Sequence, residues 1–334
     1  MTGEHPTDPL LEVHGLAVRL GGRDIVTDAD LVLRRGELVA VVGPNGAGKS
    51  TIVRAAAGLT RPAAGTVLWG GRDVRSVGPR RLARLRAFVP QRPQVPQGVS
   101  VEEAVAIGRS SHIGPLSRPG AADRLAVTEA LERAAAAGLR DRQLTTLSGG
   151  ELQRVQLAVG LAQGAPALIA DEPTSALDLG ATATMARLLR SLADDGLGVI
   201  LVVHDLALAS AIADEVVVVE AGRTVATGPP SAVLTADRLA RTWRVDAALA
   251  TDATGRTALH VGWLGGPPGA SSPDGTGDDP DGAGDDPTGE HPAGTAPPAG
   301  VTGAPSSGVP VAPDPPPGAP GAIHPPTTEG PPAP

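Results

Sequence analysis

The stretch Gly43-Pro44-Asn45-Gly46-Ala47-Gly48-Lys49-Ser50-Thr51 decides the fold of this chain. It follows an apolar, β-branched run at 37–42 that is typical of a buried parallel strand, and it leads into residues 52–57, which favour a helix. A G-x-x-x-x-G-K-[ST] pattern between a strand and a helix indicates a phosphate-binding loop, whose backbone N–H groups and helix N-terminus attract an anion. We expect Lys49 to reach the β- and γ-phosphates of a nucleotide, and the Ser50 hydroxyl to bind Mg²⁺.

An accidental match is the alternative, because the chain is rich in glycine, with 44 glycines among 334 residues. However, Lys49 is the only lysine in the sequence, and every other basic side chain is an arginine. Chance placement of that one lysine at the motif position is improbable. We therefore interpret the loop as a binding site for nucleotide phosphates.

Composition narrows the classes of function. The 36 acidic residues include nine between 265 and 334, where no Lys or Arg occurs, so the rest of the chain is close to neutral. A neutral body argues against a broad nucleic-acid-binding surface, and no nucleic-acid partner is expected. The lack of cysteine excludes disulfides and thiolate metal sites. Neither a signal sequence nor an apolar run of ~20 residues is visible, so we expect a cytoplasmic protein that reaches membranes only through a partner.

The sequence predicts two regions with different organisation. Residues 10–264 are expected to form an α/β domain, in which two strands, 11–20 and 25–33, pair antiparallel beside the strand of the phosphate loop. Helical periodicity from about 98 to 164 predicts a helical subdomain set into that domain. Residues 265–334 are rich in Gly, Pro and Asp and bury little apolar surface, so we expect a disordered acidic tail. A tail that docks a partner is the alternative.

Polar side chains follow two further predicted strands near the loop strand. Residues 86–89 lead into Gln91, and residues 167–170 lead into Asp171 and Glu172. Two acids at the end of an apolar strand are costly to bury unless a cation or a proton transfer employs them. We expect Asp171 to hold Mg²⁺ and Glu172 to orient or deprotonate the attacking water. The alternatives are a solvated strand end and an ordinary loop glutamine.

His204 follows a third apolar run, at 198–203. In a doubly wound sheet the ligand lies at the carboxyl ends of the strands, so we expect His204 to contact the γ-phosphate. A structural histidine is the alternative. The other histidines have no such placement, and the sequence assigns them no role.

A second helix start flanked by glycines occurs at Leu147-Ser148-Gly149-Gly150-Glu151. Ser148 is expected to cap the following helix, with Glu151 three residues later completing a capping box. A well-capped helix is the plain interpretation. A helix N-terminus of this kind is also an anion site, and the first loop already surrounds its phosphates from one side. The second site is therefore predicted to act on a nucleotide held by another copy of the chain.

In this order, these motifs and Ser175-Ala176-Leu177-Asp178 resemble those of the ATP-binding subunits of ABC transporters, over about residues 10–264. The resemblance implies a P-loop core with an antiparallel β subdomain and a helical subdomain. It also implies a head-to-tail dimer that encloses two ATP molecules, each between the Walker A loop of one subunit and Ser148, Gly149 and Gly150 of the other.

The resemblance further implies a role for each matching residue. Gln91 would sense Mg²⁺ and couple to the transmembrane permease subunits, and Glu172 would be the catalytic base. Asp178 would belong to a loop that communicates across the dimer, and His204 would be the switch histidine. One departure concerns adenine, which the family usually stacks on an aromatic residue in the first strand hairpin. Here Leu20 stands in that place and the chain has no tyrosine, so we expect Leu20 to cover the base by apolar contact.

A single nucleotide domain without membrane spans is similar to an importer subunit. Residues 96–103, 106–109 and 151–158 are similar to importers of heme, iron-siderophores and cobalamin, with heme importers most similar. The resemblance thus implies an ATPase on the cytoplasmic face of the membrane that drives uptake, with a substrate-binding protein as an indirect partner. Zinc, manganese or other cargo, and export, remain alternatives.

Two other classes of protein are less consistent with the sequence. Non-transport ATPases of the superfamily, in DNA repair or translation, usually carry two nucleotide domains or a long coiled coil, and neither is visible here. A P-loop GTPase would need an Asn-Lys-x-Asp motif, which a chain with Lys49 as its only lysine cannot contain. A P-loop kinase would leave the Ser148-Gly149-Gly150 turn unexplained.

Overall fold

The structure is a computed structural model that describes residues 8–92, 95–114, 117–251 and 257–262. The chain divides into two units after Pro273, and the described residues all belong to the first. The tail predicted at 265–334 lies outside the described residues, so its predicted disorder stays a prediction. No helix among the described residues is long and apolar enough to cross a bilayer.

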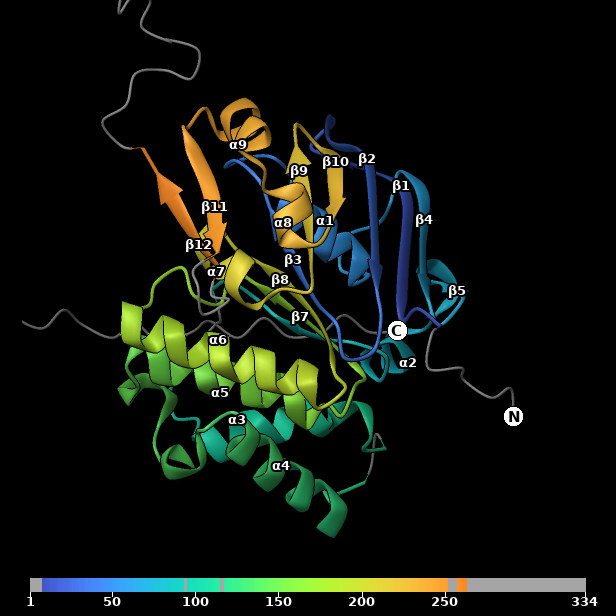
Figure 1. Ribbon diagram of the computed structural model, residues 1–334. Helices are drawn as coiled ribbons and strands as arrows, with labels where there is room; N and C mark the ends of the chain where they lie inside the picture. Colours follow the sequence, from blue (N-terminus) through green and yellow to red (C-terminus); the bar gives the residue numbers. More distant parts are fainter. Residues whose placement is uncertain (1–7, 93–94, 115–116, 252–256, 263–334) are drawn as a thin grey trace, which may run out of the picture. The chain divides into compact units, whose positions relative to one another are not determined.

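A mixed β-sheet runs through the first unit (Figure 1). Its strands are β1 (Leu11–Leu20), β2 (Arg23–Leu33), β3 (Leu38–Val42), β4 (Ala64–Trp69), β5 (Arg72–Asp73), β6 (Ala87–Val89), β7 (Ala167–Asp171), β8 (Gly198–Val202), β9 (Glu215–Glu220) and β10 (Arg223–Gly228). Within the described residues their order is β5-β4-β1-β2-β10-β9-β3-β8-β7-β6. Strands β9, β3, β8, β7 and β6 pair in parallel, whereas β1 pairs antiparallel with both β2 and β4.

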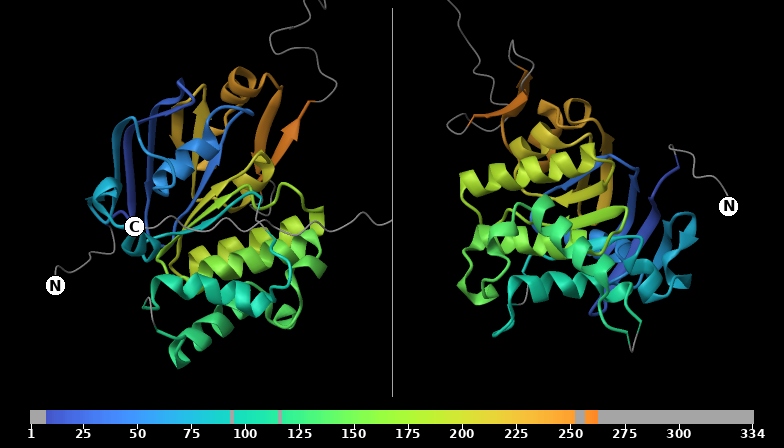
Figure 2. Two further views of the ribbon diagram at one scale, coloured as in Figure 1. Left: turned by 180° about the vertical axis from the view of Figure 1, so that it is seen from behind. Right: turned by 90° about the horizontal axis from the view of Figure 1, so that it is seen from below.

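The helices and 3₁₀ turns connect these strands. The helices are α1 (Lys49–Ala56), α2 (Pro79–Ala83), α3 (Val101–Ile107), α4 (Ala121–Arg133), α5 (Gly149–Ala162), α6 (Leu179–Asp194), α7 (Leu206–Ile212), α8 (Pro230–Val233) and α9 (Ala236–Trp243). The 3₁₀ turns are η1 (Val74–Ser76), η2 (Gly108–Ser111), η3 (Ala137–Leu139) and η4 (Leu144–Thr146). Figures 1 and 2 show α3, α4 and α5 gathered beyond one end of the parallel strands, where the sequence predicts a helical subdomain. A hairpin of β11 (Ala247–Thr251) and β12 (Thr257–Val261) ends the described part.

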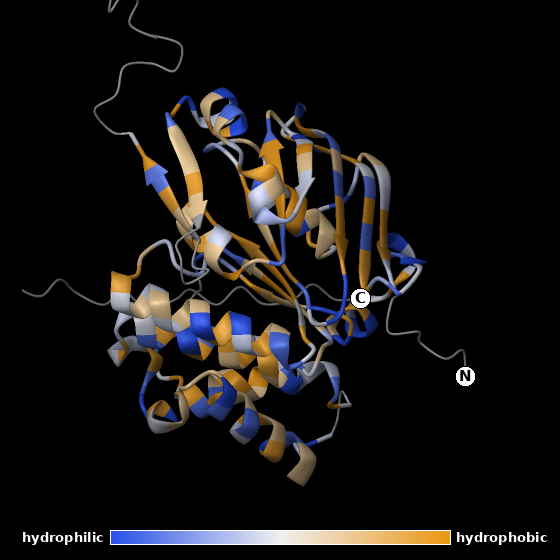
Figure 3. Cartoon of the chain, in the orientation of Figure 1, coloured by the Kyte–Doolittle hydropathy of each residue, from blue (hydrophilic) through white to orange (hydrophobic). Residues whose placement is uncertain are grey.

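Apolar side chains cover both faces of the parallel strands. All residues of β3, β7 and β8 are buried, and these strands are mostly orange in Figure 3. Side chains of a strand alternate between faces, so Leu38 and Ala40 join one core while Val39 and Val41 join the other. The first core includes the helical subdomain, and the second lies between α1 and strands β1, β2 and β4. This double burial fixes the carboxyl ends of β3, β7 and β8 relative to one another.

The structure corrects one detail of the sequence prediction. The β1–β2 pair does not lie beside β3, because β9 and β10 stand between them, with Arg223 of β10 paired to Asp28 of β2. Residues 230–243 form two short helices, α8 and α9. Leu234 leaves the helical region with ψ 53°, and the Thr235 side chain then caps α9. Strand β11 was not predicted.

Candidate active site

The phosphate loop joins the end of β3 to the start of α1, as the motif predicts. Gly43 and Gly48 have φ angles of 152° and 100°, which favour glycine. A Cβ on Gly43 would lie 2.0 Å from the carbonyl oxygen of Val219 in β9, and a Cβ on Gly48 would lie 3.1 Å from that of Ile25 in β2. Glycine at these two positions therefore lets the loop lie tightly against the neighbouring strands.

Lys49 is the centre of this loop. Its side chain is buried, and Nζ donates hydrogen bonds to the carbonyl oxygens of Gly43 at 2.9 Å and Pro44 at 3.1 Å. Burial lowers the pKa of Lys49, whereas the nearby carboxylates of Glu172 and Asp171 oppose that shift. An ammonium group held at the N-terminus of a helix inside a glycine loop fits the phosphates of a nucleotide. The remaining loop residues are the exposed Asn45 and Gly46, the buried Ala47 and the half-buried Thr51.

Ser50 and Asp171 form a polar pair beside the loop. The Ser50 hydroxyl donates to Oδ1 of Asp171 at 2.8 Å, across 121 residues of sequence. Burial raises the pKa of Asp171, and the hydrogen bond from Ser50 acts in the opposite direction. These oxygens suit Mg²⁺, which prefers one or two carboxylates together with phosphate oxygens and water. Among the described residues, no cluster of three or more His, Cys, Asp or Glu side chains could hold a metal by itself.

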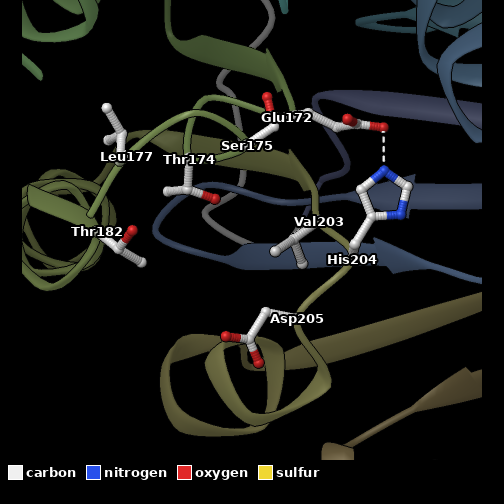
Figure 4. A pocket seen from close by; sticks show the side chains of 8 residues that line it. All are labelled: Glu172, Thr174, Ser175, Leu177, Thr182, Val203, His204 and Asp205. Carbon is white, nitrogen blue, oxygen red and sulfur yellow. Dashed lines mark hydrogen bonds and ion pairs between the residues drawn. The ribbon is translucent and has the colours of Figure 1, made fainter. Parts of the chain in front are cut away.

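Glu172 contacts side chains that follow two other strands of the sheet. It follows β7 directly, with φ 50°, and its side chain is buried. Gln91, two residues after β6, donates from Nε2 to Oε2 of Glu172 at 2.5 Å. His204, two residues after β8, places Nε2 2.5 Å from Oε1 (Figure 4). Each oxygen of this carboxylate is therefore held by one side chain from a neighbouring strand end, and each still has a lone pair that can accept a further hydrogen bond.

A pocket of about 220 Å³ opens beside this carboxylate (Figure 4). It is lined by Glu172, Thr174, Ser175, Leu177, Thr182, Val203, His204 and Asp205. Asp205 also caps α7, since its carboxylate accepts from the N–H of Leu208 at 3.0 Å. The pocket leaves Glu172 and His204 accessible to a small molecule.

Ser148 begins α5 with the predicted capping box. Its hydroxyl accepts from the N–H of Glu151 at 3.3 Å, and Oε2 of Glu151 accepts from the N–H of Ser148 at 2.8 Å. Ser148, Gly149 and Gly150 line a second cavity of about 750 Å³. Asp178, the N-cap residue of α6, lines it too and accepts from the N–H of Ala181 at 2.7 Å. None of loop residues 43–51 lines this cavity. Within the described chain, Ser148, Gly149 and Gly150 thus line a cavity apart from the phosphate loop.

Leu20 ends β1 at the tip of the first hairpin. Its side chain is exposed, and the turn continues through Gly21 and Gly22 with positive φ. The neighbouring Arg19 pairs with Asp24 across the turn at 2.8 Å. The exposure of Leu20 leaves it accessible to a ligand, and its predicted contact with adenine stays a prediction.

Arg142 and Arg154 also line the cavity at Ser148, although the sequence did not indicate either of them as a site residue. Arg142 bonds to Glu151, nine residues away, and to the carbonyl oxygen of Thr146. A nine-residue spacing across a 3₁₀ turn matches neither helical nor strand periodicity, so no local signal could reveal these contacts. Arg154 lies one turn after Glu151 on α5 and is half-buried, and an arginine on a helix is unremarkable in sequence.

Comparisons with known proteins agree with the motif order. A family model described as ABC transporter matches residues 26–175. The hemin import ATP-binding protein HmuV of Nocardia farcinica is 44% identical over 251 residues, which cover 72% of this chain and 86% of that protein. HmuV of Rhodococcus jostii is 42% identical over 233 residues, covering 70% of this chain and 79% of that protein.

Two further similarities concern a cobalamin import protein and a solved ABC transporter. The cobalamin import ATP-binding protein BtuD of Halobacterium salinarum is 42% identical over 252 residues, covering 75% of this chain and 63% of that longer protein. A solved chain of an inward-facing, metal-chelate type ABC transporter matches with a TM-score of 0.67 and 27% identity, covering 76% of this chain and 98% of its own length. The fold, the phosphate loop and these relatives together identify the chain as a member of the ABC transporter family, an ATP-binding subunit of the importer type.

Proposed function

We propose that this protein binds ATP with Mg²⁺ and hydrolyses it as a head-to-tail dimer, and that hydrolysis drives uptake of heme or a related iron chelate through membrane permease subunits. The observation that carries the proposal is the convergence of Gln91 and His204 on Glu172, beside the buried Lys49 and Asp171. A carboxylate with two oriented neighbours, next to a phosphate loop, suits a general base for attack of water on phosphorus.

In this mechanism the residues of the phosphate loop hold the triphosphate. Lys49 exchanges its bonds to two loop carbonyls for phosphate oxygens, at little cost because the ammonium group is already in place. Ser50, Asp171 and Gln91 would hold Mg²⁺, which supplies neutralisation of charge on the β- and γ-phosphates. Glu172 accepts the proton of the attacking water. His204 turns from the carboxylate toward the γ-phosphate oxygens.

The cavity at Ser148 supports the dimer. It presents the N-terminus of α5, which attracts anions, yet it shares none of its lining residues with the loop of the same chain. A second copy, turned head to tail, would bring its triphosphate to Ser148, Gly149 and Gly150. Asp178, at the wall of the same cavity, would then face the partner. Loss of the γ-phosphate would remove these contacts and reopen the dimer.

The cargo is proposed from relatives, since the cargo itself would be bound by other subunits. HmuV proteins of two organisms support heme, whereas the similarity to BtuD keeps cobalamin as a second candidate. We place the protein on the cytoplasmic face of the membrane, with a permease as direct partner and a substrate-binding protein as indirect partner. Uptake of labelled heme and cobalamin by vesicles carrying the complete transporter would decide between these cargoes.

The substitution Glu172→Gln tests the core of the proposal. Glutamine keeps the shape of the side chain but cannot accept a proton, so we expect ATP binding to persist, turnover to fall by a factor of at least about 100, and a dimer to accumulate with Mg-ATP. Light scattering after gel filtration measures the dimer. The matched control is the double variant Glu172→Gln with Ser148→Arg, which should bind ATP and stay monomeric. A Glu172→Gln protein that remains monomeric at saturating Mg-ATP would refute the dimer.

A further inference from the structure

Arg142 connects the two chain segments that flank Ser148. It lies between η3 and η4, and Nη2 donates to the carbonyl oxygen of Thr146, the last residue of η4, at 2.8 Å. Its Nη1 donates to Oε1 of Glu151 at 2.9 Å. The other oxygen of that carboxylate accepts from the N–H of Ser148 at 2.8 Å. Glu151 is thus shared between the guanidinium group and the residue that caps α5.

The same group forms the wall of a cavity with mixed charge. Among the residues that line the cavity of about 750 Å³, Arg142 and Arg154 are cationic, and Glu151 and Asp178 are anionic. These charges cancel, so the N-terminus of α5 leaves the wall slightly positive. Without Arg142 the side chains would sum to one negative charge, in a cavity proposed to receive a triphosphate. Repulsion between that charge and the phosphates is strong where water is partly excluded.

Glu151 remains ionised near neutral pH. Hydrogen bonds from the backbone and hydroxyl of Ser148 lower its pKa, and the positive charge of Arg142 acts in the same direction. The Glu151 side chain is only 24% exposed, so solvent screens its charge incompletely. The Glu151 carboxylate would therefore repel a triphosphate unless a cation neutralised it. Arg142 supplies that cation, with its Nη1 2.9 Å from Oε1 of Glu151.

We propose that Arg142 is a positioning residue for the ATP site of the partner subunit, because it neutralises Glu151 and orients the cap at Ser148 so that the cavity accepts a triphosphate. This inference rests on the head-to-tail dimer proposed above. It assigns the salt bridge a function that is separate from support of the η4 turn. Loss of that support would impair every Arg142 variant alike, whereas loss of neutralisation matters only while Glu151 is charged.

The two roles are separated by a double-mutant cycle in the full chain carrying Glu172→Gln. Four proteins are compared: this parent, and the parent with Arg142→Gln, with Glu151→Gln, or with both. Glutamine at 151 can still complete the capping box, because its side-chain oxygen reaches the same N–H. The quantity measured is the ATP concentration that gives half-maximal dimer, by light scattering in the presence of Mg²⁺.

The expected order follows the charge of the cavity wall. Arg142→Gln should raise the half-maximal ATP concentration about tenfold, the size of effect that loss of one charge-assisted hydrogen bond produces. Glu151→Gln should lower it, and the double variant should return to within about threefold of the parent. Arg142→Lys keeps the charge but loses the planar fork, so it should lie between the parent and Arg142→Gln.

Several results would overturn the inference. Equal impairment by Arg142→Gln with and without Glu151→Gln would mean that the bond to Thr146 is what matters. A change below about twofold in Arg142→Gln would mean that neutralisation is unimportant. Affinity of the monomer for a fluorescent ATP analogue at nanomolar protein is the control, and all four proteins should agree within about twofold. If the Glu172→Gln parent binds ATP in the control assay but never dimerises, the proposed dimer is refuted, and this inference with it. Loss of ATP binding in that assay would instead indicate misfolding.

Discussion

Two glycines of the phosphate loop offer a test of how tightly the loop is packed. Gly43 and Gly46 both have positive φ, 152° and 77°, so alanine is strained at either position. Their surroundings differ. A Cβ on Gly46 meets nothing within 4 Å, whereas a Cβ on Gly43 would lie 2.0 Å from the carbonyl oxygen of Val219. An unstrained contact is roughly 3.5 Å, so Gly43→Ala forces one backbone segment to move by more than about 1 Å.

The magnitudes follow from these contacts. Backbone strain costs about 1 kcal/mol in Gly46→Ala, and it is the only expected penalty there. Gly43→Ala adds overpacking against a buried strand of about 1–3 kcal/mol to a strain of similar size, so a loss of about 4 kcal/mol is expected. It also displaces the carbonyl oxygen of Gly43, which holds Lys49, so ATP affinity should fall more than tenfold.

Urea unfolding followed by tryptophan fluorescence, at 25 °C and without nucleotide, gives the free energy of unfolding of both variants. Binding of a fluorescent ATP analogue gives the affinity. A difference between the variants of less than about 1 kcal/mol would refute the reasoning, because the close approach of the loop to β9 would then carry no energetic weight. Gly46→Ala serves as the matched control, since it shares the loop and the sign of φ but not the contact.

Two other predictions concern the carboxylates. Burial raises the pKa of Asp171 above its ordinary 3.8, so the nucleotide-free protein loses stability as the pH rises through the raised pKa and the carboxyl group ionises. Asp171→Asn should therefore raise the urea midpoint at pH 7 and leave it unchanged at pH 3. An unchanged midpoint at pH 7 would contradict this sign, and loss of Mg²⁺-dependent ATP binding is expected in the same variant. His204→Ala removes the partner of Oε1 of Glu172, so turnover should fall about 10- to 100-fold in a phosphate-release assay. In the Glu172→Gln background, the same substitution should still allow Mg-ATP to drive dimer formation. Retention of full turnover would show that the histidine only packs beside the carboxylate.

Local patterns were sufficient for much of this protein. The phosphate loop, the acids at the end of β7 and the capping box at Ser148 are short-range features, in which a few neighbouring residues set both backbone conformation and chemistry. The run of buried residues in β3, β7 and β8 also predicted a parallel sheet, because strands covered on both faces are apolar throughout. The sequence alone therefore determined the fold class and most candidate residues of the site.

Other features depended on contacts between distant segments. Alternation along a strand shows which side chains share a face, but not which strand lies beside it, so the insertion of β9 and β10 between β2 and β3 could not be read from sequence. Gln91 and His204, which contact the two carboxylate oxygens of Glu172, lie 81 and 32 positions from Glu172 in the sequence. The bond of Arg142 to Glu151 follows no periodicity. Only tertiary packing decides such contacts, because it sets the distances between side chains that the order of residues leaves open.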